Sequence, residues 1–388
     1  MDLRTDITGK TPEERCSERR SRVEKELGLD LPYLKPVDGS IGHADEKNCE
    51  QMFGTVPLPV GYAGPLKVTF SSGEIHEIHL PLATTEGALV ASVNRGCKAL
   101  TVSGGVKISS IHHGMSRSLA FRVHDVKDVR KEIGSSAKEW MPVAHSTSQH
   151  LKVLKYELDE SDDYLFLTIY CDTDEAMGMN MVTIAAQAVG EWLEKNIDGL
   201  EFVTVAGNVD SDKKPSARVH ERGRGYEVTA EAILTEDVIR DVLKSTPEAL
   251  LAVAEAKLKH GSKIAGAIGS NLHAANIIAA LYLATGQDAA HVVEGSLTDT
   301  FVTSAQTPTS ELTVSVRCPA LLVGLRGGGT TLPAQSQCLK MLIAPKTSLH
   351  PKTQLAESIG AAVLAGEISL LAAQASHTLA SAHGTFGR

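Results

Sequence analysis

The sequence predicts an α+β fold in which a compact module of strands and helices is inserted into a larger α/β region. Residues 118–206 read in order as strand, helix, two strands, helix and strand, which is the ferredoxin-like βαββαβ arrangement. Strand and helix patterns also precede and follow this stretch. An insertion explains this order, because the chain leaves the larger region at the module and returns to it afterwards.

Within the module, apolar runs predict strands over 118–124, 151–158, 163–171 and 201–206. Helices are expected over 126–141 and 179–196. The second helix has the clearest pattern, because apolar residues recur with a 3.6-residue period; they are Met181, Ile184, Ala185, Ala188, Val189, Trp192 and Leu193.

Before the module, two strands are expected within 54–70 and 74–83, and a helix over 84–100. Thr85 is the expected N-cap of this helix, and Gly104 and Gly105 follow its end. After the module we expect a buried helix at 278–286, strands within 311–325 and a long apolar helical tract at 358–382. Residues 1–49 form a charged arm, with a short exposed helix at 15–29.

Composition excludes several classes of protein. The chain of 388 residues is long enough for two or three domains, and its net charge of -9 speaks against nucleic-acid binding. The 6 cysteines contain no CxxC pair, which indicates reduced thiols in the cytoplasm and neither a disulfide framework nor a metal site. The N-terminus has no apolar signal segment, and no apolar run is judged long enough to cross a membrane. We therefore expect a soluble cytoplasmic protein.

The segment GNVDSDKKPS at 207–216 is the most informative part of the chain. Pro215 disfavours helical geometry at Lys214, so the segment is a shaped loop. A buried loop lysine held by a carboxylate can stabilise an oxyanion that forms on a carbonyl. From this segment alone, a solvated turn is the simpler alternative.

Five segments together resemble 3-hydroxy-3-methylglutaryl-CoA (HMG-CoA) reductases. They are GNVDSDKKP at 207–215, PLATTEGALVASVNRGCKAL at 81–100, EAMGMNM at 175–181, HAANIIAALYLATGQDAA at 273–290 and RGGGTTLP at 326–333. The motifs follow the family's order over nearly the whole chain, and MGMN resembles the class I branch. The resemblance implies reduction of HMG-CoA to mevalonate and CoA by two nicotinamide cofactors.

The resemblance assigns four catalytic residues. Lys213 would stabilise the substrate oxygen, and Glu86 would supply protons, which requires its pKa to be raised by burial in an enclosed site. Asp288 would couple Lys213 to Glu86, and His383 would protonate the departing CoA thiolate. The tail around His383 would act as a flap. By position alone, Glu86 is a first-turn glutamate and Asp288 a turn residue after a helix.

Substrate contacts are expected from polar residues that match the family's motifs: Arg117, Asp212, Lys214, Lys257, His273 and Asn276. His273 and Asn276 share a helix face and are expected to contact Asp288 and substrate. Ala206 stands where class I members usually have a serine, which predicts weaker substrate binding.

The expected cofactor is NADPH, with NADH possible and no metal required. Its expected contacts are Ser148, Gln149, Glu175, Met177, Gly178, Asn180, Arg326, Gly327 and Gly328. Free N–H groups at a helix start can hold phosphate. Gln149 replaces the family's usual arginine, so Arg326 or Lys152 is the expected replacement contact to the 2′-phosphate.

The resemblance also implies a homodimer, or a dimer of dimers, with active sites at the dimer interface. The expected division is an arm at 1–49, a large substrate domain at 50–117 and 207–388, and the cofactor domain at 118–206. Two other functions stay open. One is an inactive CoA-ester-binding protein, and the other is an acyl-transfer or hydrolytic enzyme, which the lack of a nucleophile elbow disfavours.

Overall fold

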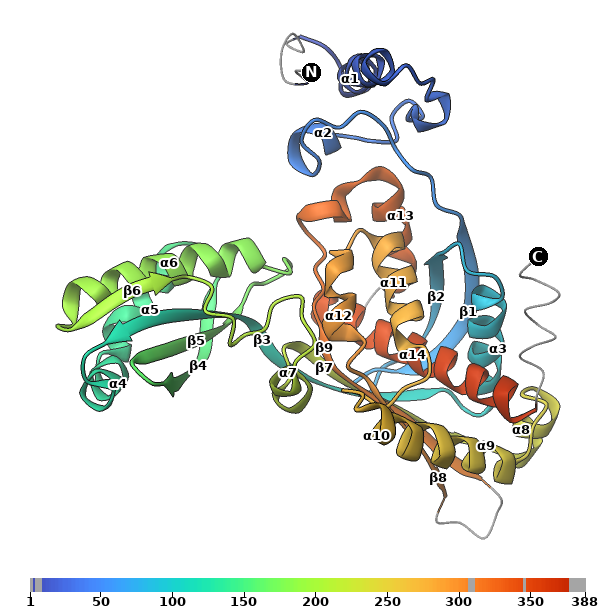
Figure 1. Cartoon of the computed structure of the whole chain (residues 1–388). Coiled ribbons are helices and arrows are strands. Elements are labelled where there is room, and N and C mark those ends of the chain that lie inside the picture. The colour runs from blue at the N-terminus through green and yellow to red at the C-terminus, as the bar shows by residue number, and fades with distance from the viewer. Residues whose placement is uncertain (1–2, 4–8, 306–310, 345–346, 377–388) are drawn as a thin grey trace.

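The computed structural model describes residues 3, 9–305, 311–344 and 347–376, so His383 and the expected C-terminal flap lie outside the described residues. Strand β3 (Val106–Val123) connects the two lobes in Figure 1. Its first half belongs to a sheet with the strand order β2-β1-β3-β7-β9-β8, and its second half pairs with β5 and β6. One 18-residue strand therefore belongs to both parts of the fold.

The larger lobe is built on strands β1 (Val60–Thr69), β2 (Ile75–Ala83), β7 (Gly225–Leu234), β8 (Asp299–Ser304) and β9 (Leu312–Leu321). Helices α3 (Leu89–Val102), α11 (Ala274–Thr285) and α14 (Pro351–Ala375) pack against them. Their apolar side chains form one buried cluster with those of the sheet. The strands expected before the module and the buried helix after it are confirmed.

The smaller lobe has the predicted ferredoxin-like order. After β3 come α4 (Val126–Ser135), α5 (Ala137–Ser146), β4 (Lys152–Ser161), β5 (Tyr164–Asp172), α6 (Met179–Asn196) and β6 (Leu200–Thr204). The strands pair antiparallel in the order β6-β3-β5-β4. A second buried apolar cluster fills this lobe. The predicted α+β class with an inserted ferredoxin-like module is confirmed.

Two predicted helices differ from those observed. The helix expected over 126–141 is divided between α4 and α5 at Ser136, whose hydroxyl donates to the Glu132 carbonyl. The helix expected from 84 begins only at Leu89, because Ala88 has a left-handed φ of 70°. Thr85 is therefore not its N-cap. Glu86 lies in the turn before the helix, where its N–H donates to Thr84 Oγ1 at 3.0 Å.

The N-terminal arm is better ordered than its sequence predicts. Helix α1 (Pro12–Leu27) starts with a capping box formed by Thr11 and Glu14. Its Arg15 is bonded to Asp45 of the short helix α2 (Ala44–Lys47) at 2.6 Å, and Arg19 is buried beside the same carboxylate. The expectation of an exposed helix is therefore wrong for one face of α1, which packs on the following segment through Cys16, Arg19 and Val23.

Short helices also lie in the arm and between the main elements of the larger lobe. They are η1 (Pro32–Leu34), α7 (Ala217–Arg222), α8 (Glu236–Asp241), α9 (Pro247–Ala254), the π-helix η2 (Glu255–Gly261), α10 (Ser262–Ala265), η3 (Ala289–His291), α12 (Val292–Gly295), η4 (Gly328–Thr331) and α13 (Pro333–Leu342).

Helix α14 corrects the expectation that no run is long enough to cross a membrane. Within the described part of the chain it is the one helix with sufficient length and hydropathy, at 25 residues with an 18-residue window of mean hydropathy 1.6. However, 94% of its apolar window is buried inside the protein. The core helix of a folded domain has the same properties, so this helix is weak support for a membrane span.

Candidate active site

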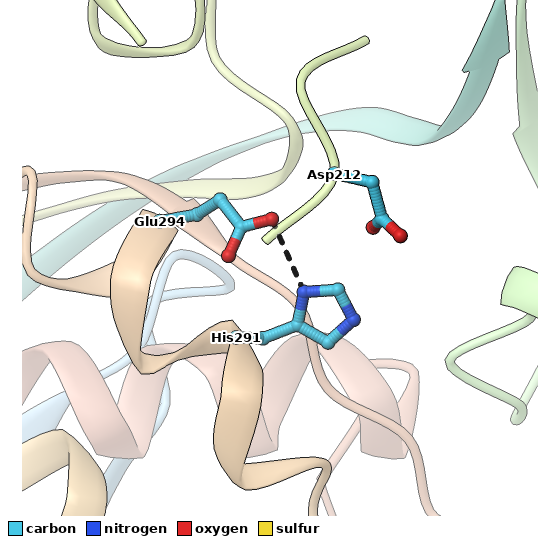
Figure 2. Close-up of side chains that lie close together, drawn as sticks. All are labelled: Asp212, His291 and Glu294. Atoms are coloured by element: carbon cyan, nitrogen blue, oxygen red, sulfur yellow. Dashed lines mark hydrogen bonds and ion pairs between the residues drawn. The ribbon is translucent and has the colours of Figure 1, made fainter. Parts of the chain in front are cut away.

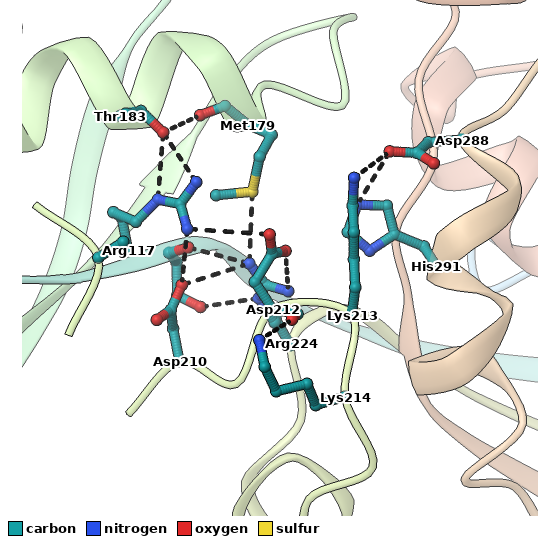
Figure 3. A network of polar contacts seen from close by, with 12 residues as sticks. Arg117, Met179, Thr183, Asp210, Asp212, Lys213, Lys214, Arg224, Asp288 and His291 are labelled. Atoms are coloured by element: carbon teal, nitrogen blue, oxygen red, sulfur yellow. Dashed lines mark hydrogen bonds and ion pairs between the residues drawn. The ribbon is translucent and has the colours of Figure 1, made fainter. Parts of the chain in front are cut away.

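The residues predicted to carry chemistry fall into two separate groups in one chain. One group lies around the loop 207–216, and the other lies around the N-terminus of α11. Figure 3 shows the first group, in which side chains from β3, α6, the loop and the α11–α12 connection converge.

Lys213 and Asp288 form the expected ion pair, with 2.8 Å between Nζ and Oδ2. Gly286 ends α11 with a left-handed φ of 69°, which places Asp288 just beyond the helix. Burial acts to raise the pKa of Asp288, but hydrogen bonds from Lys213 and from the Ala290 N–H prevail and hold this pKa below its ordinary value. The carboxylate therefore stays ionised beside the ammonium.

The conformation of the loop is set by residues around Lys213. Lys213 has a left-handed φ of 57°, and Ser216 caps the following helix α7. The Lys213 side chain is 41% exposed, so the buried loop lysine expected from the sequence is not buried in this single chain. Lys214 turns back and donates to the Asp212 carbonyl at 2.9 Å. The two adjacent lysines thus have different partners.

Arg117 lies under the loop as one of the expected substrate contacts. Its Nε and Nη2 donate to Thr183 Oγ1, and its Nη1 is 3.6 Å from Asp210 and 3.8 Å from Asp212. Burial raises the pKa of Asp210, against the opposing effects of Arg224 and Arg117. A substrate carboxylate at Arg117 would have to compete with these two aspartates.

A cleft of about 910 Å³ opens beside the Lys213–Asp288 pair. Its walls include the N-terminus of α6 and the glycine-rich loop at 326–329. Of the expected cofactor contacts, it is lined by Ser148, Met177, Gly178, Asn180, Arg326, Gly327 and Gly328. Gln149 and Glu175 do not line it, although Glu175 forms an ion pair with Arg326.

Glycines shape this cleft where backbone segments approach closely. Gly178 precedes α6 with a φ of 95°, and a Cβ there would lie 2.3 Å from Thr173 Cγ2. Sequence reasoning missed other lining residues, namely Asn48, Thr147, Gln287 and Gln335. Asn48 comes from the N-terminal arm, and no sequence pattern ties it to the site.

The second group contains Glu86, and of its members Asn276 contacts the Glu86 carboxylate directly. Asn276 Nδ2 donates to Glu86 Oε2 at 2.7 Å, His273 Nε2 lies 2.8 Å from the Gly366 carbonyl, and Lys257 Nζ donates to Gln374 at 3.3 Å. The expected contact of His273 and Asn276 with Asp288 is not found. Helix α11 has 12 residues, so its two ends are about 18 Å apart.

Glu86 is exposed in the single chain, and Asp288 lies beyond the other end of α11. The expected coupling of Glu86, Lys213 and Asp288 in one network is therefore absent within the described part of one chain. Glu86 is expected from the sequence to lie in an enclosed site, and the described residues of one chain do not enclose it.

A cluster of possible metal ligands lies beneath the lysine loop, where the sequence spacing gave no sign of one. Ligand atoms of Asp212, His291 and Glu294 lie within 4.8 Å of one another (Figure 2). However, Arg224 Nη1 donates to both carboxylates at 3.0 Å. The guanidinium supplies the positive charge that this cluster requires, so the chemistry of the donor set fits an ion-pair network better than a cation site.

Comparison with known proteins supports the family resemblance that the sequence motifs indicate. The family model for hydroxymethylglutaryl-coenzyme A reductase matches residues 15–388. The 3-hydroxy-3-methylglutaryl-coenzyme A reductase of Methanocaldococcus jannaschii is 40% identical over 380 residues, covering 95% of this chain and 92% of that protein. The reductase of Methanothermobacter thermautotrophicus is 39% identical over 375 residues, with the same two coverages of 95% and 92%.

Solved structures with the same fold include the class II 3-hydroxy-3-methylglutaryl-CoA reductase from Streptococcus pneumoniae bound to NADPH. It matches with a TM-score of 0.69 and 21% identity, covering 94% of this chain and 87% of that one. A second structure of the reductase from this organism has a TM-score of 0.69 at 20% identity, covering 92% and 96%. At this identity the likeness shows the fold alone.

Proposed function

Because the chain belongs to the hydroxymethylglutaryl-CoA reductase family, we propose that it reduces HMG-CoA to mevalonate and CoA with two nicotinamide cofactors. The observation that carries this proposal is the Lys213–Asp288 ion pair of 2.8 Å at the edge of the large cleft. A cation at this place stabilises negative charge on a carbonyl oxygen as it is reduced.

The residues around the cleft fit a dinucleotide. The backbone N–H groups in the first turn of α6 have no partner within that helix and suit a phosphate, and Gly327 and Gly328 have open space where side chains would stand. When bound, the nicotinamide supplies the hydride. We propose NADPH, with NADH possible; the solved structure at 21% identity is of a protein bound to NADPH.

Four residues divide the work in this proposal. Lys213 stabilises the substrate oxygen in both reductions, and Asp288 holds the Lys213 ammonium in place and couples it to the proton donor. Glu86, hydrogen-bonded to Asn276, supplies the protons. His383, outside the described residues, protonates the departing thiolate so that it does not attack again.

A complete site then requires two chains. Glu86 and Asp288 lie at opposite ends of α11, whereas a proton donor and an oxyanion-stabilising cation must meet within hydrogen-bond distance of the same substrate. We propose that one subunit of a homodimer supplies Arg117, Asp212, Lys213, Lys214 and Asp288, and that the other supplies Glu86, Lys257, His273 and Asn276. The separation of the two groups supports this arrangement.

We also propose a class I-like enzyme with three structural parts, a cytoplasmic location and no requirement for a metal. MGMN at 177–180 supports a class I-like enzyme. Three apolar clusters support a division into an arm at 1–49, a substrate domain at 50–117 and 207–388, and a cofactor domain at 118–206. The cluster of the cofactor domain also takes in Val219, Leu297, Ala320 and Leu322 of the substrate domain. The free cysteines fit a cytoplasmic location. The Arg224 contacts described above support a reaction without a metal.

The test follows nicotinamide oxidation by absorbance with HMG-CoA and measures CoA release in parallel. The reductase oxidises about two cofactors per CoA, as the four-electron stoichiometry requires. No oxidation combined with tight HMG-CoA binding would favour the inactive CoA-ester-binding protein, which Ala206 motivates. CoA release without oxidation would indicate a hydrolase and overturn the proposal.

A further inference from the structure

Lys213 is held in a backbone conformation that a lysine rarely adopts. Its φ of 57° lies in the left-handed region, where a side chain with a Cβ is disfavoured and persists only when its surroundings impose it. The direction of the Lys213 side chain follows from this backbone. Whatever imposes the conformation therefore also points the ammonium toward Asp288.

The contact that imposes it comes from Glu294, on the short helix α12. The Lys213 N–H donates to Glu294 Oε1 at 2.6 Å. Glu294 has an exposed fraction of 0%. A buried carboxylate that accepts a main-chain N–H fixes that backbone strongly, because a hydrogen bond to a charged group is stronger than one between neutral groups and water cannot replace it at a buried site.

Glu294 is itself fixed by the two neighbours with which it shares Oε1. Arg224 Nη1 donates to this atom at 3.0 Å, and His291 Nδ1 lies 3.2 Å from it (Figure 2). Arg224 is anchored in turn by its Nε bond to Ser116 Oγ at 3.0 Å. Three groups therefore surround Glu294 Oε1, whereas its Oε2 has no hydrogen-bond partner among the described residues.

His291 connects this group to the other end of the catalytic pair. Its Nε2 lies 3.7 Å from Asp288 Oδ2, at the edge of Figure 3 where the Lys213–Asp288 pair is drawn. Nε2 has no hydrogen-bond partner among the described residues. These contacts form a ring, which runs from the Lys213 backbone through Glu294, His291 and Asp288 back to the Lys213 ammonium.

We propose that Glu294 is a positioning residue for the reaction, acting through the Lys213 backbone and held by Arg224 and His291. It touches neither substrate nor cofactor in this role. The proposal rests on the proposed function for its effect on turnover, but its geometric part concerns only where the Lys213 ammonium lies.

Glu294→Ala and Glu294→Gln test this role against a matched control. The control is Glu357, another fully buried glutamate, which accepts the Ser71 N–H at 3.0 Å and the Ser110 hydroxyl at 2.6 Å, away from the cleft. Glu294→Ala should lower kcat by at least about tenfold with little change in KM, since only charge stabilisation in the transition state is lost. Glu294→Gln keeps an oxygen acceptor and should recover part of the loss. Glu357→Ala and Glu357→Gln should lower Tm and leave kcat within about twofold.

A second readout needs neither substrate nor cofactor. Reductive methylation of Lys213, measured by mass spectrometry relative to Lys214, reports how firmly Asp288 holds the ammonium. The ratio should rise in both Glu294 variants and stay at the wild-type value in the Glu357 variants. If the wild type shows no reductase activity, the proposed function fails while this ratio still tests Glu294. An unchanged ratio, or equal kcat losses in the Glu294 and Glu357 variants, would overturn the positioning role; if Glu294→Ala does not fold, Glu294→Gln decides.

Discussion

Two inactive variants of this chain should restore activity to each other when they share a dimer. Glu86→Gln removes the proposed proton donor, and Lys213→Ala removes the oxyanion-stabilising cation. In one chain these residues belong to opposite ends of α11, which has 12 residues and is therefore about 18 Å long. Hydrogen-bonded catalysis requires separations of about 3 Å, so each site must combine residues from two chains.

The size of the effect follows from symmetry. When the two variants are mixed and allowed to exchange subunits, half of the dimers carry one of each. A mixed dimer has one site with both residues intact and one site with neither, so the sample should reach about a quarter of wild-type activity. Either variant alone should stay near the background rate.

The assay co-expresses the two variants with different affinity tags, isolates the mixed dimers and follows nicotinamide oxidation with HMG-CoA. Since one of the two sites in every isolated mixed dimer is intact, the purified sample should reach about half of wild-type activity. The matched control pairs Lys213→Ala with Asp288→Asn. Both residues lie in the same group, so every mixed dimer has one defect in each site and should stay inactive. Isolated mixed dimers of Glu86→Gln and Lys213→Ala that show no activity would refute the shared site.

Four further outcomes are expected. Lys213→Ala should leave the fold intact and retain less than a tenth of wild-type activity, since a lost oxyanion partner costs on the order of 3–4 kcal/mol in the barrier. A higher remaining activity would argue against Lys213 as the group that stabilises the oxyanion. His383→Gln should spare reduction of supplied mevaldehyde but impair HMG-CoA turnover, and equal losses in both assays would contradict thiolate protonation. Arg326→Val or Lys152→Ala should lower the ratio of kcat/KM for NADPH over NADH, by about tenfold to a hundredfold if that residue holds the 2′-phosphate; a wild-type ratio near one would refute this. Because the folded-state pKa of Asp288 is depressed, its stabilising effect is complete above about pH 4 and is lost as pH falls through the folded pKa. Asp288→Asn should therefore flatten the acid limb of Tm against pH, and an unchanged acid limb would contradict the depressed pKa.

The sequence by itself determined the fold class and most of the elements that carry it. Helix α6 was predicted over the residues it occupies, because a 3.6-residue apolar period is a local property of a helix with one buried face. The start of α3 was placed wrongly because Ala88 adopts a left-handed φ of 70°. No residue type at this position signals that conformation, which the surroundings impose.

The sequence also determined which residue types carry the chemistry, through the motifs around Glu86, Lys213 and Asp288. Only the tertiary structure decided which of them meet. It joined Lys213 to Asp288, joined Glu86 to Asn276 and separated the two pairs by the length of α11. It also brought the buried Glu294 to the Lys213 backbone across 81 residues of chain. Contacts of this kind depend on how distant elements pack, and local sequence patterns do not record that packing.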